Sequence, residues 1–162
     1  MTFKALRFWP VLLAVVFADC ASKRAIEARL APAPGPQPVA GDFVRFRLSY
    51  NQDAAFGIPA GGNGRWVLAA IAALGVVAMV IAYRFTDPRR TILITSFALI
   101  AGGALGNMID RLRSTRGVVD FVDVGIGNLR FYTFNVADVA ITCGAVLLFY
   151  TLMLKERKAG DA

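Results

Sequence analysis

Acidic side chains gather at the ends of two long apolar segments of this chain. Asp110 closes one apolar run, Asp120 and Asp123 follow within a short stretch, and Asp138 opens the next run. Charged groups beside membrane-length segments are costly to place, so they indicate a functional site. Two carboxyls held close together cannot both ionise cheaply, because like charge raises one of the two pKa values. One carboxyl then holds a proton while the other acts as a base.

The arrangement favours Asp120 and Asp138 as such a pair, without excluding a different partner. Asp120 lies among the apolar residues of VVDFV (118–122), so an apolar surface delivers its carboxyl to the membrane face that carries Asp138. Pairs of this kind activate water and protonate an amide in aspartic proteases, and they titrate as a unit. Asp123 competes for the role of Asp120, and spacing alone does not separate them.

The same residues also have purely structural interpretations. Asn135 is a good helix N-cap, and Asp138 three residues later can reach back to it as in a capping box. Asp110 can form an ion pair with Arg111, and Asn107 can cap the C-terminal end of the preceding helix.

The composition places the chain in a membrane. Of 162 residues, 57% are hydrophobic, and the mean hydropathy is +0.56. The net charge of +7 comes from Lys and Arg that flank the apolar runs, which favours anionic lipid headgroups over nucleic acid as partners. The chain has no histidine, and its two cysteines lie in separate apolar runs, so we predict neither a metal nor a cofactor.

Four apolar segments are long enough to span a bilayer. We predict an all-α polytopic membrane protein that forms a single domain over 1–162, with helices at about 8–26, 66–83, 91–109 and 136–154. The Pro- and Gly-rich segment 31–38 predicts a linker, and alternation within 42–50 predicts a half-buried strand of a small outward β-sheet over about 42–58. A cleaved signal peptide ending before Cys20 is disfavoured, because Asp19 stands where a small neutral residue is needed.

Basic residues at the short chain ends and turns set the predicted orientation. Lys4 and Arg7, the turn at 84–90 and the segment 155–158 all fall on one side, which the positive-inside rule makes cytoplasmic. Both termini are then inside, and the acidic cluster faces outward. At that outer end, Asp19 and Lys23 are four residues apart and predict either an ion pair at the membrane surface or a polar rim around a site.

Three motifs carry a family resemblance. GNMIDR (106–111), VVDF (118–121) and FNVAD (134–138), in this order between two helix ends, resemble lipoprotein signal peptidase, the bacterial membrane aspartyl peptidase called signal peptidase II. The resemblance covers nearly the whole chain, because the first helix with Asp19 and Lys23 and the stretch NQDAAFG (51–57) also match in place.

The resemblance implies residue roles that spacing does not provide. It makes Asp120 and Asp138 the catalytic carboxyls and leaves Asp123 without a role. It also implies that Asn51 and Arg111 hold the substrate backbone. The full set of supporting residues is Asp19, Lys23, Asn51, Asn107, Asp110, Arg111 and Asn135. The chain departs from the family at Asp53, where the family usually has glycine in an Asn-x-Gly loop.

The implied activity is cleavage of the signal peptide from diacylglyceryl-modified prolipoproteins, before the lipidated cysteine. The resemblance further implies a protein of the bacterial inner membrane, in contact with membrane lipids and sensitive to globomycin. Nothing in the sequence demands more than a monomer. Two rival interpretations remain: a small membrane carrier that uses Asp110, Arg111 and Asp138 as an ion relay, and a structural subunit. A relay should place charge near mid-bilayer, whereas these residues collect at one end.

Overall fold

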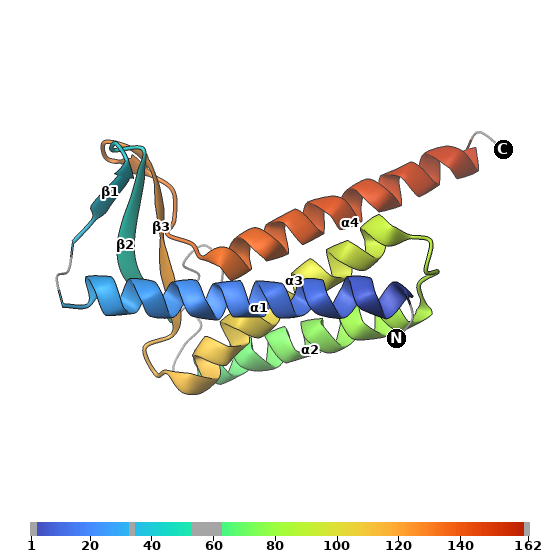
Figure 1. Cartoon of the computed structure of the whole chain (residues 1–162), viewed down its shortest axis with the longest axis horizontal. Helices are drawn as coiled ribbons and strands as arrows, with labels where there is room; N and C mark the ends of the chain where they lie inside the picture. The colour runs from blue at the N-terminus through green and yellow to red at the C-terminus, as the bar shows by residue number, and fades with distance from the viewer. Residues whose placement is uncertain (1–2, 33–34, 53–62, 161–162) are drawn as a thin grey trace.

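Four long helices and one small sheet make up the protein. The computed structural model describes residues 3–32, 35–52 and 63–160, with side chains as far as residue 153. The helices are α1 (Phe3–Leu30), α2 (Gly64–Phe85), α3 (Thr91–Arg113) and α4 (Val136–Gly160), and the strands are β1 (Gln37–Ala40), β2 (Val44–Asn51), β3 (Val118–Ile126) and β4 (Leu129–Arg130). All four helices are long and apolar enough to cross a membrane. The sheet stands at the end of the helices away from both termini (Figure 1), which confirms the predicted fold class.

The helices extend beyond the spans that hydropathy predicts. α1 continues to Leu30, because Ile26 and Leu30 pack against Phe121 of the sheet instead of ending at the membrane edge. α3 continues past 109 to Arg113, so Asp110 and Arg111 lie within its last turns. Hydropathy marks the apolar part of a helix, whereas contacts beyond the bilayer decide where that helix ends.

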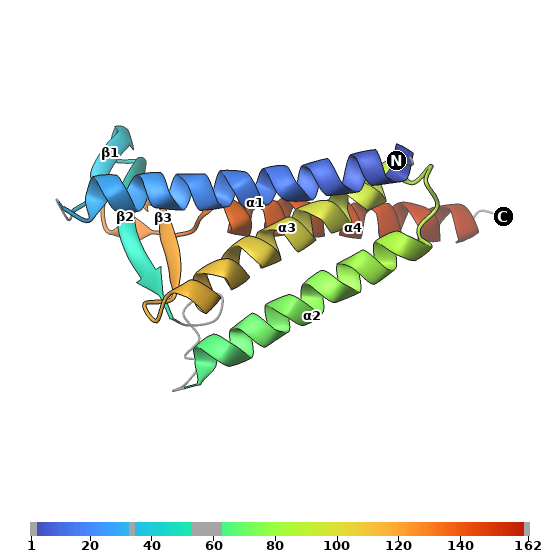
Figure 2. The same cartoon turned by 60° about the horizontal axis from the view of Figure 1, so that its bottom comes forward.

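Helix α3 lies at the centre of the bundle and packs against the other three helices (Figure 2). Of its apolar window 61% is buried, against 11–17% for the other helices, whose outer faces are left for lipid. Small residues allow the close approach. A Cβ on Gly103 would collide with the Ala137 carbonyl oxygen at the start of α4, and one on Gly102 would lie 3.0 Å from the Leu12 carbonyl oxygen in α1.

Gly103→Ala is expected to destabilise the bundle by about 1–3 kcal/mol, because the added methyl must push the backbone of α4 away. The shift would fall on the first turn of α4 and therefore on Asp138. Thermal unfolding in detergent measures it. Gly75→Ala is the matched control: a Cβ there meets nothing within 4 Å, so alanine in α2 should be neutral or stabilise by up to about 1 kcal/mol. Equal stability of the two variants would contradict the close contact.

The sheet is antiparallel with strand order β1-β2-β3-β4. Strand β1 begins at Gln37, inside the segment 31–38 for which the sequence predicts only a linker, so that prediction is wrong at its end. Pro38 is tolerated because β1 is an edge strand. Strand β3 and the short β4 were not predicted as strands, since VVDFVDV lacks a clean apolar–polar alternation. A bulge in β2 between Phe46 and Ser49 shifts its register against β3.

Candidate active site

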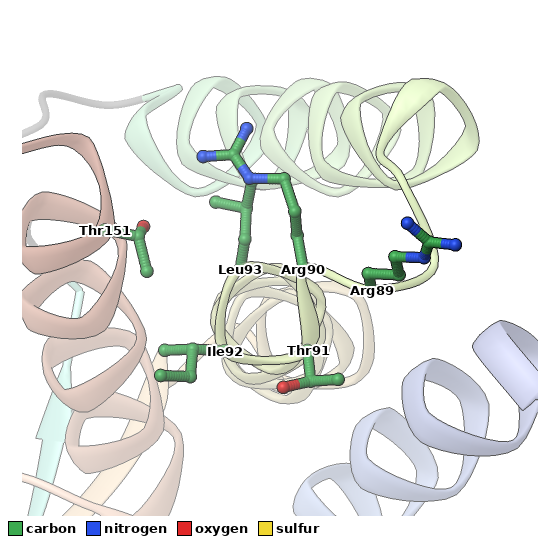
Figure 3. Close-up of a pocket in the computed structure, with 6 residues that line it drawn as sticks. All are labelled: Arg89, Arg90, Thr91, Ile92, Leu93 and Thr151. Carbon is green, nitrogen blue, oxygen red and sulfur yellow. The ribbon is translucent and has the colours of Figure 1, made fainter. Parts of the chain in front are cut away.

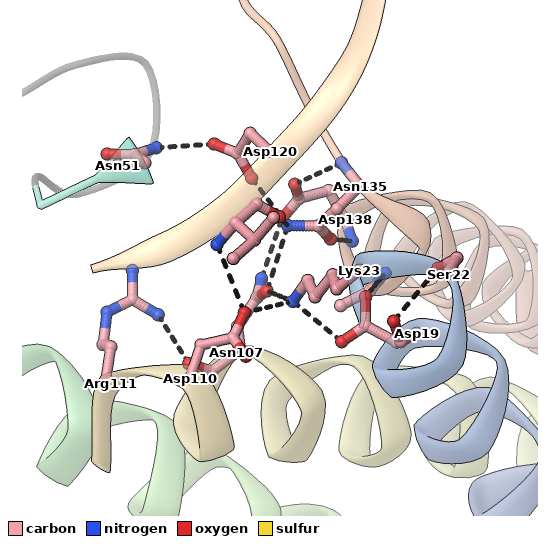
Figure 4. Close-up of polar contacts among 12 residues, drawn as sticks. Asp19, Ser22, Lys23, Asn51, Asn107, Asp110, Arg111, Asp120, Asn135 and Asp138 are labelled. Atoms are coloured by element: carbon pink, nitrogen blue, oxygen red, sulfur yellow. Dashed lines mark hydrogen bonds and ion pairs between the residues drawn. The ribbon is translucent and has the colours of Figure 1, made fainter. Parts of the chain in front are cut away.

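Two carboxyls from different elements meet where the sheet joins the helices (Figure 4). Asp120 lies on β3, opposite Ser49 of β2, and is 3% exposed. Asp138 lies in the first turn of α4. We call this pair of carboxyls the dyad. After β4 the chain returns to β3 at Phe134, which pairs with Val122, and so delivers the start of α4 to Asp120.

Three asparagine side chains donate hydrogen bonds to the dyad. Asn135 Nδ2 donates to Asp120 Oδ1 at 2.7 Å, and Asn51 Nδ2 donates to Asp120 Oδ2 at 3.1 Å. Asn107 Nδ2 donates to Asp138 Oδ1 at 2.8 Å. These amides come from β2, α3 and the start of α4, so the geometry of the dyad depends on all three parts of the fold.

The capping box predicted at the start of α4 is present. The Asn135 backbone N–H donates to Asp138 Oδ2 at 3.1 Å, and the Asp138 backbone N–H donates to Asn135 Oδ1 at 3.0 Å. The structural interpretation of these residues is therefore confirmed, but it is incomplete. Because the Asn135 amide also contacts Asp120, the same residue links both carboxyls.

Lys23 is the centre of a buried ion cluster behind the dyad. Its Nζ lies 2.8 Å from Asp19 Oδ2 and 2.8 Å from Asp110 Oδ2, and it donates to Asn107 Oδ1 at 2.9 Å. The Asp19–Lys23 pair forms as its spacing predicts, but the surface location is wrong: Asp19 is 0% and Lys23 2% exposed. Gly106 makes room for the carboxylate, since a Cβ there would lie 2.5 Å from Asp19 Oδ2.

Asp19 also fixes the start of α4 from a different helix. Its Oδ1 accepts the Ala137 backbone N–H at 3.0 Å, so a carboxylate of α1 satisfies a free amide in the first turn of α4. No local sequence signal marks this contact, because the two residues are 118 positions apart. For Asp19, spacing left open a polar rim around a site, and the family resemblance gave it a supporting role.

Two further structural interpretations of α3 residues are corrected. Asn107 does not cap the helix, which continues to Arg113; its side chain instead joins Lys23 to Asp138. The ion pair of Asp110 is with Lys23, and Asp110 Oδ2 also accepts the backbone N–H of Val119, next to Asp120. Arg111 is half-buried, and its Nη1 lies 3.4 Å from the Asn107 carbonyl oxygen.

The structure separates Asp123 from Asp120. The two residues are three positions apart on a regular strand, so their side chains point to opposite faces of the sheet. Asp123 is 2% exposed, and its two oxygens bond to Arg130 Nε at 2.8 Å and to Arg45 Nη2 at 2.8 Å. Arg130 also donates to the Asp42 carbonyl oxygen at 2.7 Å. Asp123 therefore ties β2, β3 and β4 together. Sequence reasoning missed both arginine partners.

Asp123→Asn is expected to lower the free energy of unfolding by about 1–3 kcal/mol near neutral pH, because it removes charge-assisted hydrogen bonds. Burial alone would raise the pKa of Asp123, but hydrogen bonds and charge from Arg130 and Arg45 outweigh it and hold that pKa below its usual value. The charged form thus stabilises the fold. Its contribution is full above the unfolded pKa of about 3.9 and is lost as pH falls through the folded pKa.

Thermal unfolding of both proteins in detergent between about pH 3 and about pH 7 tests this pH dependence. The difference in melting temperature between wild type and Asp123→Asn should become smaller toward acid pH. Asp42→Asn serves as the control, because that carboxylate is 55% exposed and its ion pairs should contribute under about 1 kcal/mol. A difference in melting temperature that does not change with pH would mean that ionisation of Asp123 does not stabilise the sheet.

The electrostatics of the site single out Asp120. Burial and the nearby charge of Asp138 together raise the pKa of Asp120 to about 6, although hydrogen bonds from Asn51 and Asn135 lower it. A carboxyl with a pKa near neutrality can hold a proton for transfer. The site therefore combines Asp138, whose carboxylate accepts hydrogen bonds, with Asp120, whose carboxyl takes up a proton readily.

Other features of the described chain do not compete with this site. Within residues 3–32, 35–52 and 63–153, no three His, Cys, Asp or Glu side chains gather in a way that suits a metal ion. A pocket of about 230 Å³ lies at the far end of the helices, near the start of α3, and contains no carboxyl (Figure 3). Asp53, where the chain departs from the family loop, lies outside the described residues.

Comparison with known proteins gives a consistent result. The model of the family described as signal peptidase (SPase) II matches residues 11–154. The lipoprotein signal peptidase of Symbiobacterium thermophilum is 38% identical over 150 residues, covering 91% of this chain and 96% of the relative. The lipoprotein signal peptidase of Burkholderia vietnamiensis is 42% identical over 149 residues, covering 91% of this chain and 87% of the relative.

A solved structure is also similar. It is described as a bacterial membrane enzyme, and it superposes with a TM-score of 0.80 at 27% identity, covering 90% of this chain and 87% of the other.

Proposed function

The chain belongs to the signal peptidase II family, and we propose that Asp120 and Asp138 are the carboxyls with which it hydrolyses its substrate. It is an aspartic endopeptidase that cleaves the signal peptide from diacylglyceryl-modified prolipoproteins, N-terminal to the lipidated cysteine. One observation supports the residue assignment above all: Asn135 contacts both carboxyls. Its side chain donates to Asp120, and its backbone N–H donates to Asp138.

In the proposed mechanism, Asp138 is the base and Asp120 the acid. Asp138 takes a proton from a water molecule, and the resulting hydroxide attacks the carbonyl carbon of the scissile bond. Asp120 gives its proton to the carbonyl oxygen as the tetrahedral intermediate forms. When the C–N bond breaks, the leaving amine takes up the proton that Asp138 received. As the C–N bond breaks, a hydroxyl of the tetrahedral intermediate returns a proton to Asp120, so the new carboxyl group forms and the dyad is singly protonated again.

Two features support this division of roles. Asp138 accepts a backbone N–H at the N-terminus of α4, where the helix dipole favours a negative charge. Asp120 lies on a strand, and burial together with the charge of Asp138 raises its pKa to about 6. A bound peptide and acyl chains would exclude more water and raise the pKa of Asp120 further, which favours its protonated form.

The remaining polar residues position the dyad and the substrate. Asn51 and Arg111 lie on the same side of the carboxyls in Figure 4, and we assign them to the peptide backbone of the substrate. The other five orient the dyad through the contacts described above: Asp19, Lys23, Asn107, Asp110 and Asn135.

The protein is a membrane-embedded enzyme with several spans. We assign it to the bacterial inner membrane, with both termini cytoplasmic and the dyad at the outer face. The basic turn with Arg84, Arg89 and Arg90 supports this orientation. In this arrangement the substrate's signal helix and acyl chains reach the dyad laterally from the bilayer. We also propose that it acts as a monomer and binds membrane lipids and globomycin.

The test uses the purified chain in liposomes with matched synthetic prolipoprotein peptides. One peptide carries a diacylglyceryl cysteine and the other a free cysteine. Cleavage before the cysteine of the lipidated peptide, with little or none of the free one, is the expected result. Ion flux across the same liposomes without any cleavage would instead support the carrier interpretation, which the named relatives do not favour.

A further inference from the structure

A second polar pocket lies behind the catalytic site, between the C-terminal halves of α1 and α3. Its volume is about 220 Å³. We call it the α1–α3 pocket, and it is lined by Cys20, Lys23, Arg24, Glu27, Asp110, Arg113, Ser114, Arg116, Gly117 and Val119. The mechanism above uses Lys23 and Asp110 from the side of the dyad and leaves the rest of this pocket without a role.

The charges in the pocket do not cancel. With Asp19, which lies 2.8 Å from Lys23, four cationic side chains face three carboxylates, which leaves an excess of one positive charge. Lys23 and Asp110 form one ion pair at 2.8 Å, and Arg116 and Glu27 form another at 3.2 Å.

The remaining positive charge therefore resides on Arg24 and Arg113. Both residues are exposed. Neither side chain has a hydrogen bond or ion pair within residues 3–32, 35–52 and 63–153. Two guanidinium groups that line one pocket, one from α1 and one from α3, form a site for an anion with several oxygen acceptors, and guanidinium matches phosphate geometry particularly well.

The position of the pocket points to lipid as the source of that anion. Arg24 lies in the last two turns of α1 and Arg113 ends α3, at the same end of the membrane spans as the sheet. Side chains at the ends of spanning helices reach the level of the lipid headgroups, where phosphate groups are concentrated. A soluble phosphate would instead have to compete with these headgroups.

We propose that the α1–α3 pocket binds the phosphate of an anionic phospholipid, held by Arg24 and Arg113. An anionic headgroup is favoured over a zwitterionic one, because the unpaired charge of the pocket is positive and a choline group would be repelled. Lys23 lines the pocket and also donates a hydrogen bond to Asn107, which in turn donates one to Asp138. A bound phosphate would therefore be connected to Asp138 through Lys23 and Asn107. This proposal does not depend on the assignment of the catalytic residues.

Lipid retention tests the proposal without measuring catalysis. The full chain is placed in phosphatidylcholine nanodiscs with or without phosphatidylglycerol, and the lipids that remain bound after release are counted by native mass spectrometry. Wild type should retain phosphatidylglycerol in preference to phosphatidylcholine. Arg113→Gln should reduce this preference about fivefold and Arg24→Gln/Arg113→Gln by about twenty-fivefold, because each arginine near a membrane surface contributes about a factor of five.

Arg47→Gln is the matched control. Arg47 is an exposed arginine of β2 outside the pocket, so its loss should leave retention unchanged. An equal loss in Arg47→Gln would show that only general surface charge attracts the lipid, and equal retention of both lipids by wild type would also overturn the proposal. Inorganic phosphate added to phosphatidylcholine nanodiscs separates the two sources of phosphate. If it raises the melting temperature of the chain as much as phosphatidylglycerol does, the ligand is a soluble anion.

Discussion

Asparagine in place of Asp120 or Asp138 is expected to lower kcat for prolipoprotein cleavage by about 10³- to 10⁴-fold, the upper range for loss of an acid–base group. Asparagine keeps the shape of the side chain but neither gives nor takes a proton at neutral pH. It can still form part of the hydrogen-bond network with Asn51, Asn107 and Asn135. The folded protein should therefore persist while catalysis is lost.

Single-turnover cleavage of a diacylglyceryl peptide by each purified variant measures this effect. The informative comparison is Asp123→Asn, a third aspartate-to-asparagine change in the same segment. Asp123 is bound by two arginines on the other face of β3, so this variant should keep kcat within about tenfold of wild type where it remains folded. Wild-type cleavage by either dyad variant would refute the assignment, and a loss confined to Asp123→Asn would move the catalytic role to that residue.

The two aspartates also show what the sequence was able to predict. The apolar runs predicted four spanning helices, because hydropathy over about 20 residues is a strong local signal. The spacing of the acidic residues also predicted that either Asp120 or Asp123 lies near Asp138. Choosing between them needed contacts that no local pattern contains. The partner Arg45 lies 78 residues from Asp123, on another strand, so only the register of the folded sheet reveals that Asp123 is neutralised.

Among the supporting residues, too, some roles follow from a local sequence pattern and others depend on contacts that only the fold creates. The capping box of Asn135 and Asp138 was predictable, because its two residues are three positions apart. The roles of Asn107 and Asp19 were not, since each depends on close packing of α3 against α1 or α4. Spacing alone therefore gave Asn107 the wrong structural role, as a helix cap, and placed the Asp19–Lys23 pair at the surface. The burial of a charge depends on the neighbouring helices, and in this protein Gly106 provides the space for it.

Methionine in place of Lys23 is expected to have the largest effect on stability of any change outside the dyad. It would leave Asp19, which is fully buried, and Asp110 without their shared cation. Removing one partner of a buried ion pair costs about 3–5 kcal/mol, because the remaining charge is neither paired nor hydrated. Asn107 would also lose the ammonium that orients its carbonyl oxygen, so cleavage should decrease in parallel. Thermal unfolding in detergent and single-turnover cleavage measure the two effects.

A double variant separates the loss of the ion pair from the loss of packing. Lys4→Met, at the other end of α1, is the control and should cost at most about 1 kcal/mol, since its hydrogen bond to the Arg84 carbonyl oxygen is exposed. In Asp19→Asn/Lys23→Met the remaining charge of Asp19 is removed, while the asparagine oxygen can still accept the Ala137 backbone N–H. The double variant should therefore be more stable than Lys23→Met alone, because a neutral pair avoids the cost of a buried carboxylate. If the double variant is less stable than Lys23→Met by the full cost of Asp19→Asn alone, Lys23 stabilises the bundle by filling space. The ion cluster would then have no electrostatic role in holding the dyad.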